Sequence, residues 1–195
     1  MRLQVFLLLL CSALLSACAA NNGPRGFWKP NRYDRNSLAK GRWRTYYDAE
    51  SKQPFTTGKY RHGRPVGTFR YFDPTGALDH SERYGQDGLC EVTYWHPGGQ
   101  VARRGHAQWV TGKKGARFYW YGPWTSFDEN GQITSIQTYT NGTISRAETY
   151  NLGKLTKVET YAGNQLNRVE LYDNGLLIKV ETFENGRRTG SSLTL

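Results

Sequence analysis

Four glutamates spaced eleven residues apart and four histidines are the side chains whose types and spacing suit acid–base or metal chemistry. They are Glu148, Glu159, Glu170 and Glu181, and His62, His80, His96 and His106. The histidines show no metal-ligand spacing with a cysteine or a paired carboxylate, and each glutamate has a basic neighbour in the strand register derived below. Charge pairing between strands therefore explains the glutamates better than catalysis. No nucleophile elbow, phosphate-binding loop or dinucleotide fingerprint is present. We expect a protein that is not an enzyme and has no metal or cofactor.

Cys18 carries a different chemistry, covalent attachment of lipid. Met1-Arg2 is a short positive start, residues 3–15 are apolar, and Leu-Ser-Ala-Cys at 15–18 has the form of a bacterial lipobox. The apolar run is too short to span a bilayer, which favours a cleaved signal peptide over residues 1–17. Cleavage would leave Cys18 as the acylated first residue and membrane anchor. An ordinary signal peptide that contains cysteine and a buried apolar helix are the alternatives.

The residues around Cys18 predict location and redox state. Ala19 resembles the residue found in lipoproteins sorted to an outer membrane. We therefore expect a place in the bacterial cell envelope, on the outer membrane facing the periplasm in a Gram-negative cell. With Cys11 in the signal peptide and Cys18 acylated, Cys90 is left alone and no intramolecular disulfide can form. We interpret Cys90 as a small apolar filler, with an intermolecular bridge or reactive thiol as the alternative.

Basic residues outnumber acidic ones, giving a formal net charge of +10. They gather in residues 18–40, whose aperiodic Asn, Gly, Pro and Arg content predicts a flexible tether, and again in residues 103–117. An exported lipoprotein does not meet genomic DNA, so we expect no nucleic-acid partner. Attraction to anionic lipid head groups, a solvated surface and an acidic protein partner are the three explanations left open.

The elements that position these side chains repeat every eleven residues between 133 and 187. Each unit has seven residues that alternate as in a strand, followed by a turn pair. The pairs are Asn141-Gly142, Leu152-Gly153, Gly163-Asn164, Asn174-Gly175 and Asn185-Gly186. Asn-Gly and Gly-Asn suit two-residue hairpin loops. With these pairs at the loop tips, the predicted cross-strand partners are Glu148–Lys157, Glu159–Arg168 and Glu170–Lys179.

Earlier units open with glycine and carry more aromatic residues, as in Gly67-Thr68-Phe69 and Gly122-Pro123-Trp124. A glycine followed by aromatic residues predicts close backbone approach, with a ring lying over a glycine of the neighbouring strand. Between His106 and Tyr121 the phase of the repeat is lost, which predicts an irregular hairpin or a longer loop.

Residues 62–72, His-Gly-Arg-Pro-Val-Gly-Thr-Phe-Arg-Tyr-Phe, followed by Thr75-Gly76-Ala77-Leu78, resemble the bacterial MORN-type repeat variant, and residues 122–133 match its second half. Proteins built from this repeat are commonly labelled YwqK-type antitoxins. The resemblance implies an all-β fold, an antiparallel meander of repeated β-hairpins that forms an elongated, mostly single-layer sheet. We place the repeat domain at residues 41–187 and a C-terminal tail at 188–195.

Basic and aromatic side chains in the middle of the chain are the candidate binding residues. Those for a protein partner are Arg103, Arg104, Lys113, Lys114, Trp120 and Trp124. Trp43 and Trp95 are the candidate platform for a sugar or a quaternary ammonium group. Packing between hairpins is the alternative role of the aromatic residues, because a single-layer sheet offers no second layer to bury them.

Together these features predict a membrane-anchored lipoprotein whose repeat sheet is a protein-interaction module, with an antitoxin- or immunity-like role. The alternative is a structural or glycan-binding lipoprotein of the cell envelope, whose aromatic face binds cell-wall or surface polysaccharide.

Overall fold

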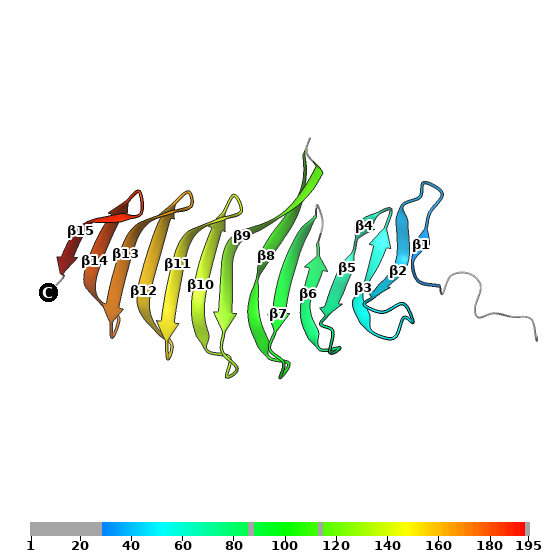
Figure 1. Cartoon of the computed structure of the whole chain (residues 1–195), viewed down its shortest axis with the longest axis horizontal. Coiled ribbons are helices and arrows are strands. Elements are labelled where there is room, and N and C mark those ends of the chain that lie inside the picture. The colour runs from blue at the N-terminus through cyan, green and yellow to red at the C-terminus, as the bar shows by residue number, and fades with distance from the viewer. Residues whose placement is uncertain (1–28, 86–87, 113–114, 194–195) are drawn as a thin grey trace, which may run out of the picture.

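The computed structural model describes residues 29–85, 88–112 and 115–193, without the side chains of residues 111–116. It contains one antiparallel sheet of fifteen strands in which strands follow one another in chain order, except that β4 pairs only with β3 (Figure 1). The strands are β1 (Arg32–Tyr33), β2 (Ala39–Tyr46), β3 (Pro54–Arg61), β4 (Arg64–Pro65), β5 (Gly67–Phe72), β6 (Leu78–Tyr84), β7 (Leu89–Trp95), β8 (Val101–Gly112), β9 (Gly115–Phe127), β10 (Ile133–Thr140), β11 (Thr143–Asn151), β12 (Lys154–Ala162), β13 (Gln165–Asp173), β14 (Leu176–Glu184) and β15 (Arg187–Leu193). The predicted all-β meander is confirmed. Among the described residues, no helix has the length and apolarity to cross a membrane.

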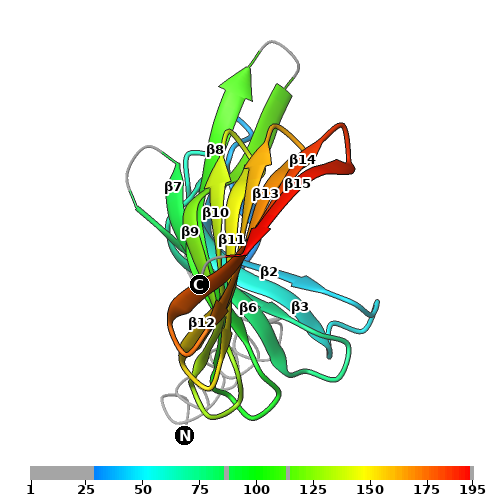
Figure 2. The same ribbon diagram turned by 90° about the vertical axis from the view of Figure 1, so that its left-hand side faces the viewer.

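The sheet is a single layer along its length and is twisted when viewed from its end (Figure 2). Because no other described segment packs across it, both faces meet solvent over much of their area and few of the described side chains are buried. The main buried cluster is Cys90, Val92, Ala107 and Trp124, in the middle of the sheet. Strands β1 and β15 form the two edges.

The two-residue turns of the C-terminal half have the predicted geometry. Asn141 and Gly142 have φ angles of 52° and 79°, and Asn174 and Gly175 have 47° and 82°. Type I′ turns need a positive φ at both central residues, which Gly and Asn adopt more readily than other residues. Leu152 occupies the same position with φ 48°, although its side chain is poorly suited to it.

The predicted pairing of charges across strands is wrong by one residue. In the structure the opposed pairs are Glu148–Val158, Glu159–Val169 and Glu170–Val180, in place of the pairs with Lys157, Arg168 and Lys179. A register shift of the β-bulge kind lies beside each turn, as between Thr149 and Tyr150. A bulge adds one residue to one strand without disturbing the turn or the alternation beyond it, so the sequence pattern did not reveal it.

This shift decides which face each glutamate occupies. Val158 opposes both Glu148 and Glu170, so these two carboxylates share one face. Val169 opposes both Glu159 and Glu181, which therefore lie on the other face. The eleven-residue sequence repeat thus corresponds to one strand, and the structural repeat that restores the same face is a pair of strands.

Rings pack over glycines in two hairpins, but the covered glycines are not the unit-opening Gly67 and Gly122, whose added Cβ atoms would meet nothing within 4 Å among the described residues. A Cβ atom placed on Gly58 would lie 2.4 Å from the Cδ1 atom of Phe69, and one on Gly105 would lie 2.2 Å from Cδ2 of Trp124. Only glycine leaves room for these rings to lie against the backbone of the next strand. Phe69 and Trp124 are consequently 2% and 0% exposed in a sheet that has no second layer.

The ends of the repeat domain and the region 106–121 differ from the predictions. Strand β1 lies inside the predicted tether, and β15 extends through most of the predicted tail. Strands β8 and β9 form one long hairpin, paired from His106–Tyr121 to Gly112–Gly115, where an irregular hairpin or loop was predicted (Figure 1). Backbone groups pair wherever a neighbouring strand offers free partners, which side-chain pattern alone does not show. The predicted signal peptide and Cys18 lie outside the described residues.

Candidate functional site

The two faces of the sheet differ in chemistry between β2 and β10. The aromatic face carries Trp43, Tyr60, Phe69, Tyr71, His80, Tyr84, Tyr94, Trp109, Trp120, Trp124 and Tyr139. The basic face carries Arg44, Lys59, Arg70, Arg83 and Arg104. Strict alternation along each strand separates these two sets of side chains.

Three arginines of the basic face lie on one row of the register. Arg44 opposes Thr57, Thr57 opposes Arg70, and the row continues through Ser81 and Thr93 to Arg104. These five basic side chains are exposed. Arg83 forms an ion pair with Glu91 at 2.5 Å. The guanidinium of Arg104 lies 5.4 Å from the centre of the Phe127 ring.

On the aromatic face, ring contacts run from strand to strand. Tyr71 and His80 are stacked with ring centres 4.2 Å apart, and His80 lies 5.0 Å from Tyr94. Farther along, Trp120 and Trp124 are stacked at 4.1 Å, with Tyr139 edge-on to Trp120. The role of aromatic packing between hairpins is therefore observed, and these contacts replace the missing second layer.

Arg103 is part of this packing. Its guanidinium lies 4.7 Å from the Trp120 ring centre and 5.0 Å from that of Trp124. One of its terminal nitrogens donates hydrogen bonds to Gln137 (2.6 Å) and Tyr139 (3.2 Å). Cation–π contacts and hydrogen bonds on this scale hold the side chain in place.

The structure separates the predicted partner-binding residues. Arg103 and Trp120 lie on the aromatic face, whereas Arg104 lies on the basic face, so they do not form one surface. Trp124 is completely buried and offers no contact area, which corrects its prediction as a binding residue. Lys113 and Lys114 lie outside the described residues.

The predicted Trp43 and Trp95 platform is also divided. Trp43 lies edge-on between Tyr33 and Tyr60, 5.4 Å from each, on β2. Trp95 ends β7, and strands β3, β5 and β6 lie between these two strands in the sheet. The indole nitrogen of Trp95 is buried and has no hydrogen-bond acceptor. The two rings therefore do not form a shared ligand surface.

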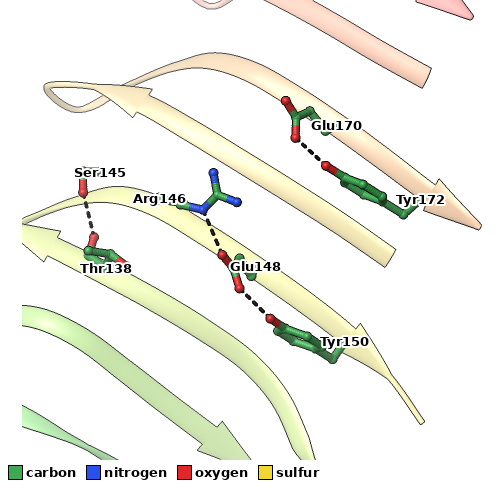
Figure 3. A network of polar contacts seen from close by, with 7 residues as sticks. All are labelled: Thr138, Ser145, Arg146, Glu148, Tyr150, Glu170 and Tyr172. Atoms are coloured by element: carbon green, nitrogen blue, oxygen red, sulfur yellow. Dashed lines mark hydrogen bonds and ion pairs between the residues drawn. The ribbon is translucent and has the colours of Figure 1, made fainter. Parts of the chain in front are cut away.

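In the C-terminal half, basic residues and tyrosines satisfy the repeated glutamates within single strands. Glu148 accepts hydrogen bonds from Arg146 (2.9 Å) and Tyr150 (2.5 Å), and Glu170 accepts one from Tyr172 (2.7 Å) (Figure 3). Arg168 also donates a hydrogen bond of 2.7 Å to Glu170. The tyrosine bond first, and then the arginine, lowers the pKa of each carboxyl group. On the other face, Lys157–Glu159 and Lys179–Glu181 are ion pairs of 3.1 and 2.7 Å. The expected pairing of these glutamates with basic residues is thus found along the strands, and Glu181 also pairs across strands with Arg188 at 3.0 Å.

Glu82 is the acidic residue that the sequence analysis missed. It lies on β6 and is 8% exposed. Its Oε2 atom accepts hydrogen bonds from Tyr71 (2.8 Å) and Tyr84 (2.6 Å). Burial first, and then the charge of Glu82, raises the pKa of both tyrosines. The shared Glu-x-Tyr spacing of Glu82-Arg83-Tyr84 and Glu148-Thr149-Tyr150 was the signal that could have found it.

The described residues contain no group of three or more His, Cys, Asp or Glu side chains placed to hold a metal ion. Cys90 is buried in the central cluster, and burial followed by the charge of Glu82 raises its pKa to about 12. Its thiol therefore stays protonated at neutral pH, as suits an apolar filler. What the geometry offers is two exposed faces of different chemistry, an arrangement suited to binding.

Sequence comparison identifies one repeat unit. Residues 120–141 match the family model described as the MORN repeat variant. This segment is a MORN repeat. It runs from Trp120 to Asn141 and so contains the Gly122-Pro123-Trp124 opening, the β9–β10 turn and the β10 strand. The family unit therefore spans a pair of strands, in agreement with the structural repeat that restores the same face. No curated protein sequence matches the chain.

Among solved structures, the chain is similar to TarM, with 12% sequence identity and a TM-score of 0.36. That match covers 64% of this chain and 22% of TarM. A second TarM structure, from S. aureus and in complex with Fondaparinux, alpha-GlcNAc-glycerol and UDP, gives 11% identity and a TM-score of 0.30, covering 57% of this chain and 19% of that one. The chain thus spans about a fifth of the length of these proteins.

Proposed function

We propose that this protein is a membrane-anchored lipoprotein whose MORN-type sheet is a protein-interaction module, and that its basic face binds an acidic partner protein. The role would be antitoxin- or immunity-like, with Cys18 as the lipid anchor. The lipobox at 15–18 supports the anchor.

The proposal rests mainly on one observation, the row of exposed arginines formed by Arg44, Arg70 and Arg104. Exposed charges of one sign on a flat face accelerate encounter with an oppositely charged protein and orient it. A row that crosses strands β2 to β8 offers several separate contacts to one partner. Arginine also recognises carboxylates with two parallel hydrogen bonds, which adds geometric specificity.

The test is a cross-linking pull-down from native membranes with three variants. Cys18→Ala removes the anchor. The triple variant Arg44→Ser/Arg70→Ser/Arg104→Ser removes the row. The matched control is Arg35→Ser/Lys52→Ser/Arg187→Ser, which removes the same charge from exposed positions away from the row.

We expect one dominant protein partner, lost with the row variant and retained by the control, and weaker capture at high salt because ions screen exposed charges. Loss of the partner from membranes with Cys18→Ala would support tethering. Capture that is equal in both triple variants would reject the basic face. Recovery of glycan fragments without a stoichiometric protein would favour the envelope glycan-binding alternative.

A further inference from the structure

The aromatic face contains a hollow of about 870 Å³. It is separate from the basic face and from the contacts that Arg103 makes with Trp120 and Trp124. Side chains from β3, β5, β6 and β8 surround it. Its lining includes Tyr60, Phe69, Tyr71, Tyr84 and Trp109, with the exposed Arg64 also contributing.

Two of these rings each stand nearly at right angles to the ring of Phe69. Tyr60 meets Phe69 at 78° with ring centres 5.0 Å apart, and Tyr84 meets Phe69 at 80° and 5.7 Å. Trp109 extends the wall, since its indole nitrogen donates a hydrogen bond of 3.2 Å to the Tyr84 hydroxyl. Rings that enclose a space from several sides are the arrangement that attracts a cation, because each ring face is the negative part of its quadrupole.

The carboxylate of Glu82 lies behind this wall, hydrogen-bonded to the hydroxyls of Tyr71 and Tyr84. Its surroundings depart from the repeat in one respect. Each of the four repeated glutamates has a basic residue two positions earlier that pairs with it, as Arg146 pairs with Glu148. At the corresponding position before Glu82 stands His80, whose Nδ1 atom lies 2.6 Å from Asp79 and whose ring stacks on Tyr71.

Glu82 therefore lacks the cation that the repeat supplies elsewhere. None of the ion pairs formed among the described residues involves it, although it is almost fully buried. A buried carboxylate gains from an opposite charge nearby. The neighbouring hollow, lined by two of the tyrosines that contact Glu82, is where a ligand would supply that charge.

We infer that the hollow between Tyr60, Tyr84 and Trp109 binds an alkylammonium group, with the aromatic rings and the Glu82 carboxylate as the recognition elements. The site is independent of the proposed protein contact on the basic face. A quaternary ammonium compound and a lysine side chain of another protein present the same chemistry. The positive charge of Arg64 opposes binding, so affinity depends on Glu82.

The experiment is calorimetric titration of the full chain, purified from membranes in an uncharged maltoside detergent. The probes are choline, the neutral isostere of choline in which a tert-butyl group replaces trimethylammonium, and Nα-acetyl-lysine amide. Tryptophan indole NMR signals report whether Trp109 senses the probe. Glu82→Gln removes the charge and keeps the shape, while His80→Arg installs the missing cation. Glu91→Gln is the matched control, a carboxylate on the opposite face.

We expect choline or the lysine derivative to bind saturably, and the neutral isostere at least about tenfold more weakly. Glu82→Gln should weaken binding about tenfold, His80→Arg should abolish it by pairing with Glu82, and Glu91→Gln should have no effect. Preference between the two cations distinguishes a quaternary ligand from a lysine side chain. The inference would be overturned if the wild-type protein bound the neutral isostere as tightly as choline, or if it bound neither cation. Both comparisons use the wild-type protein and do not depend on the folding of a variant.

Discussion

At the scale of single residues, stability depends on rings that cover glycines. Trp124 reaches full burial in a one-layer sheet only because Gly105 has no side chain. The ring then contributes its indole hydrogen bond to the His106 carbonyl, 3.1 Å away, and its contact with Trp120. The glycine and the ring thus act as one unit of packing, although they lie on different strands.

Gly105→Ala should destabilise the protein by about 2 kcal/mol, because the new Cβ would overlap the Trp124 ring and force it out of place. Gly85→Ala is the control, since its Cβ would meet only the Leu89 carbonyl at 3.7 Å. Urea unfolding followed by tryptophan fluorescence measures both. Equal midpoints for the two variants would contradict the role of Gly105.

At the scale of elements, turns and bulges decide how the strands fit together. Two-residue turns join the C-terminal strands. The longer turns between β5 and β6 and between β9 and β10 are instead held by aspartates. Asp73 accepts backbone hydrogen bonds from Thr75 and Ala77, and Asp128 accepts them from Asn130 and Gln132. Aspartate suits these longer turns because its carboxylate accepts hydrogen bonds from backbone N–H groups two and four residues further on.

Leu152→Asn should stabilise the protein by about 1 kcal/mol, because a leucine at φ 48° is strained and asparagine tolerates this conformation. Leu152 is also 80% exposed, so its replacement removes no packing. Leu176→Asn is the control, an equally exposed leucine that lacks a positive φ. The measurement is the thermal midpoint of each variant by circular dichroism, and a lower midpoint for Leu152→Asn would refute the strain.

The carboxylates of Glu148 and Glu170 should make stability depend on pH. Hydrogen bonds from Tyr150 and Tyr172, and then the arginines, lower their folded pKa below the ordinary value of 4.5. Their stabilisation is therefore fully present above pH 4.5 and is lost as the pH falls through the folded values.

The variant Glu148→Gln/Glu170→Gln should accordingly be less stable than wild type at pH 7 by about 0.5 kcal/mol per site, and the difference should shrink below pH 4.5. Urea unfolding across pH 3 to 7 tests this, with the exposed Glu184→Gln as control. A difference that stayed constant over this range would show that these carboxylates do not act through their charge.

At the scale of the whole molecule, the sheet is an array in which each strand pairs through its backbone with the strands beside it. Stability in such an array is close to a sum over units and their interfaces. The C-terminal units repeat with little change, while the units around Trp124 hold the buried cluster. The two halves should therefore differ in how they tolerate the loss of one unit.

Deleting residues 155–165, one sequence repeat, should leave a folded sheet that is shorter by a strand. Deleting residues 122–132, the same length, removes Trp124 and uncovers Gly105, and should abolish cooperative unfolding. Circular dichroism and urea unfolding distinguish the two outcomes. Loss of folding in both deletions would show that the array is more cooperative than its contacts indicate.

Much of the fold could be predicted because its signals are local. Alternation in residues 155–161 gives a strand, Asn174-Gly175 gives a tight turn, and Gly122-Pro123-Trp124 gives a ring over a neighbouring glycine. The lipobox at Cys18 is equally local, and its lipidation remains a prediction. The candidate site was predicted less well, since Arg104 and Trp120 are close in sequence but lie on opposite faces.

The sequence by itself determined the strands and turns of the C-terminal half, since alternation and turn chemistry act over a few residues. Only the tertiary structure decided the faces. One extra residue in a bulge exchanges the two sides of the next strand, which moved Glu148 away from Lys157 and into line with Val158. The burial of Glu82 beside Tyr71 was decided in the same way, because it depends on which strands meet and in which register.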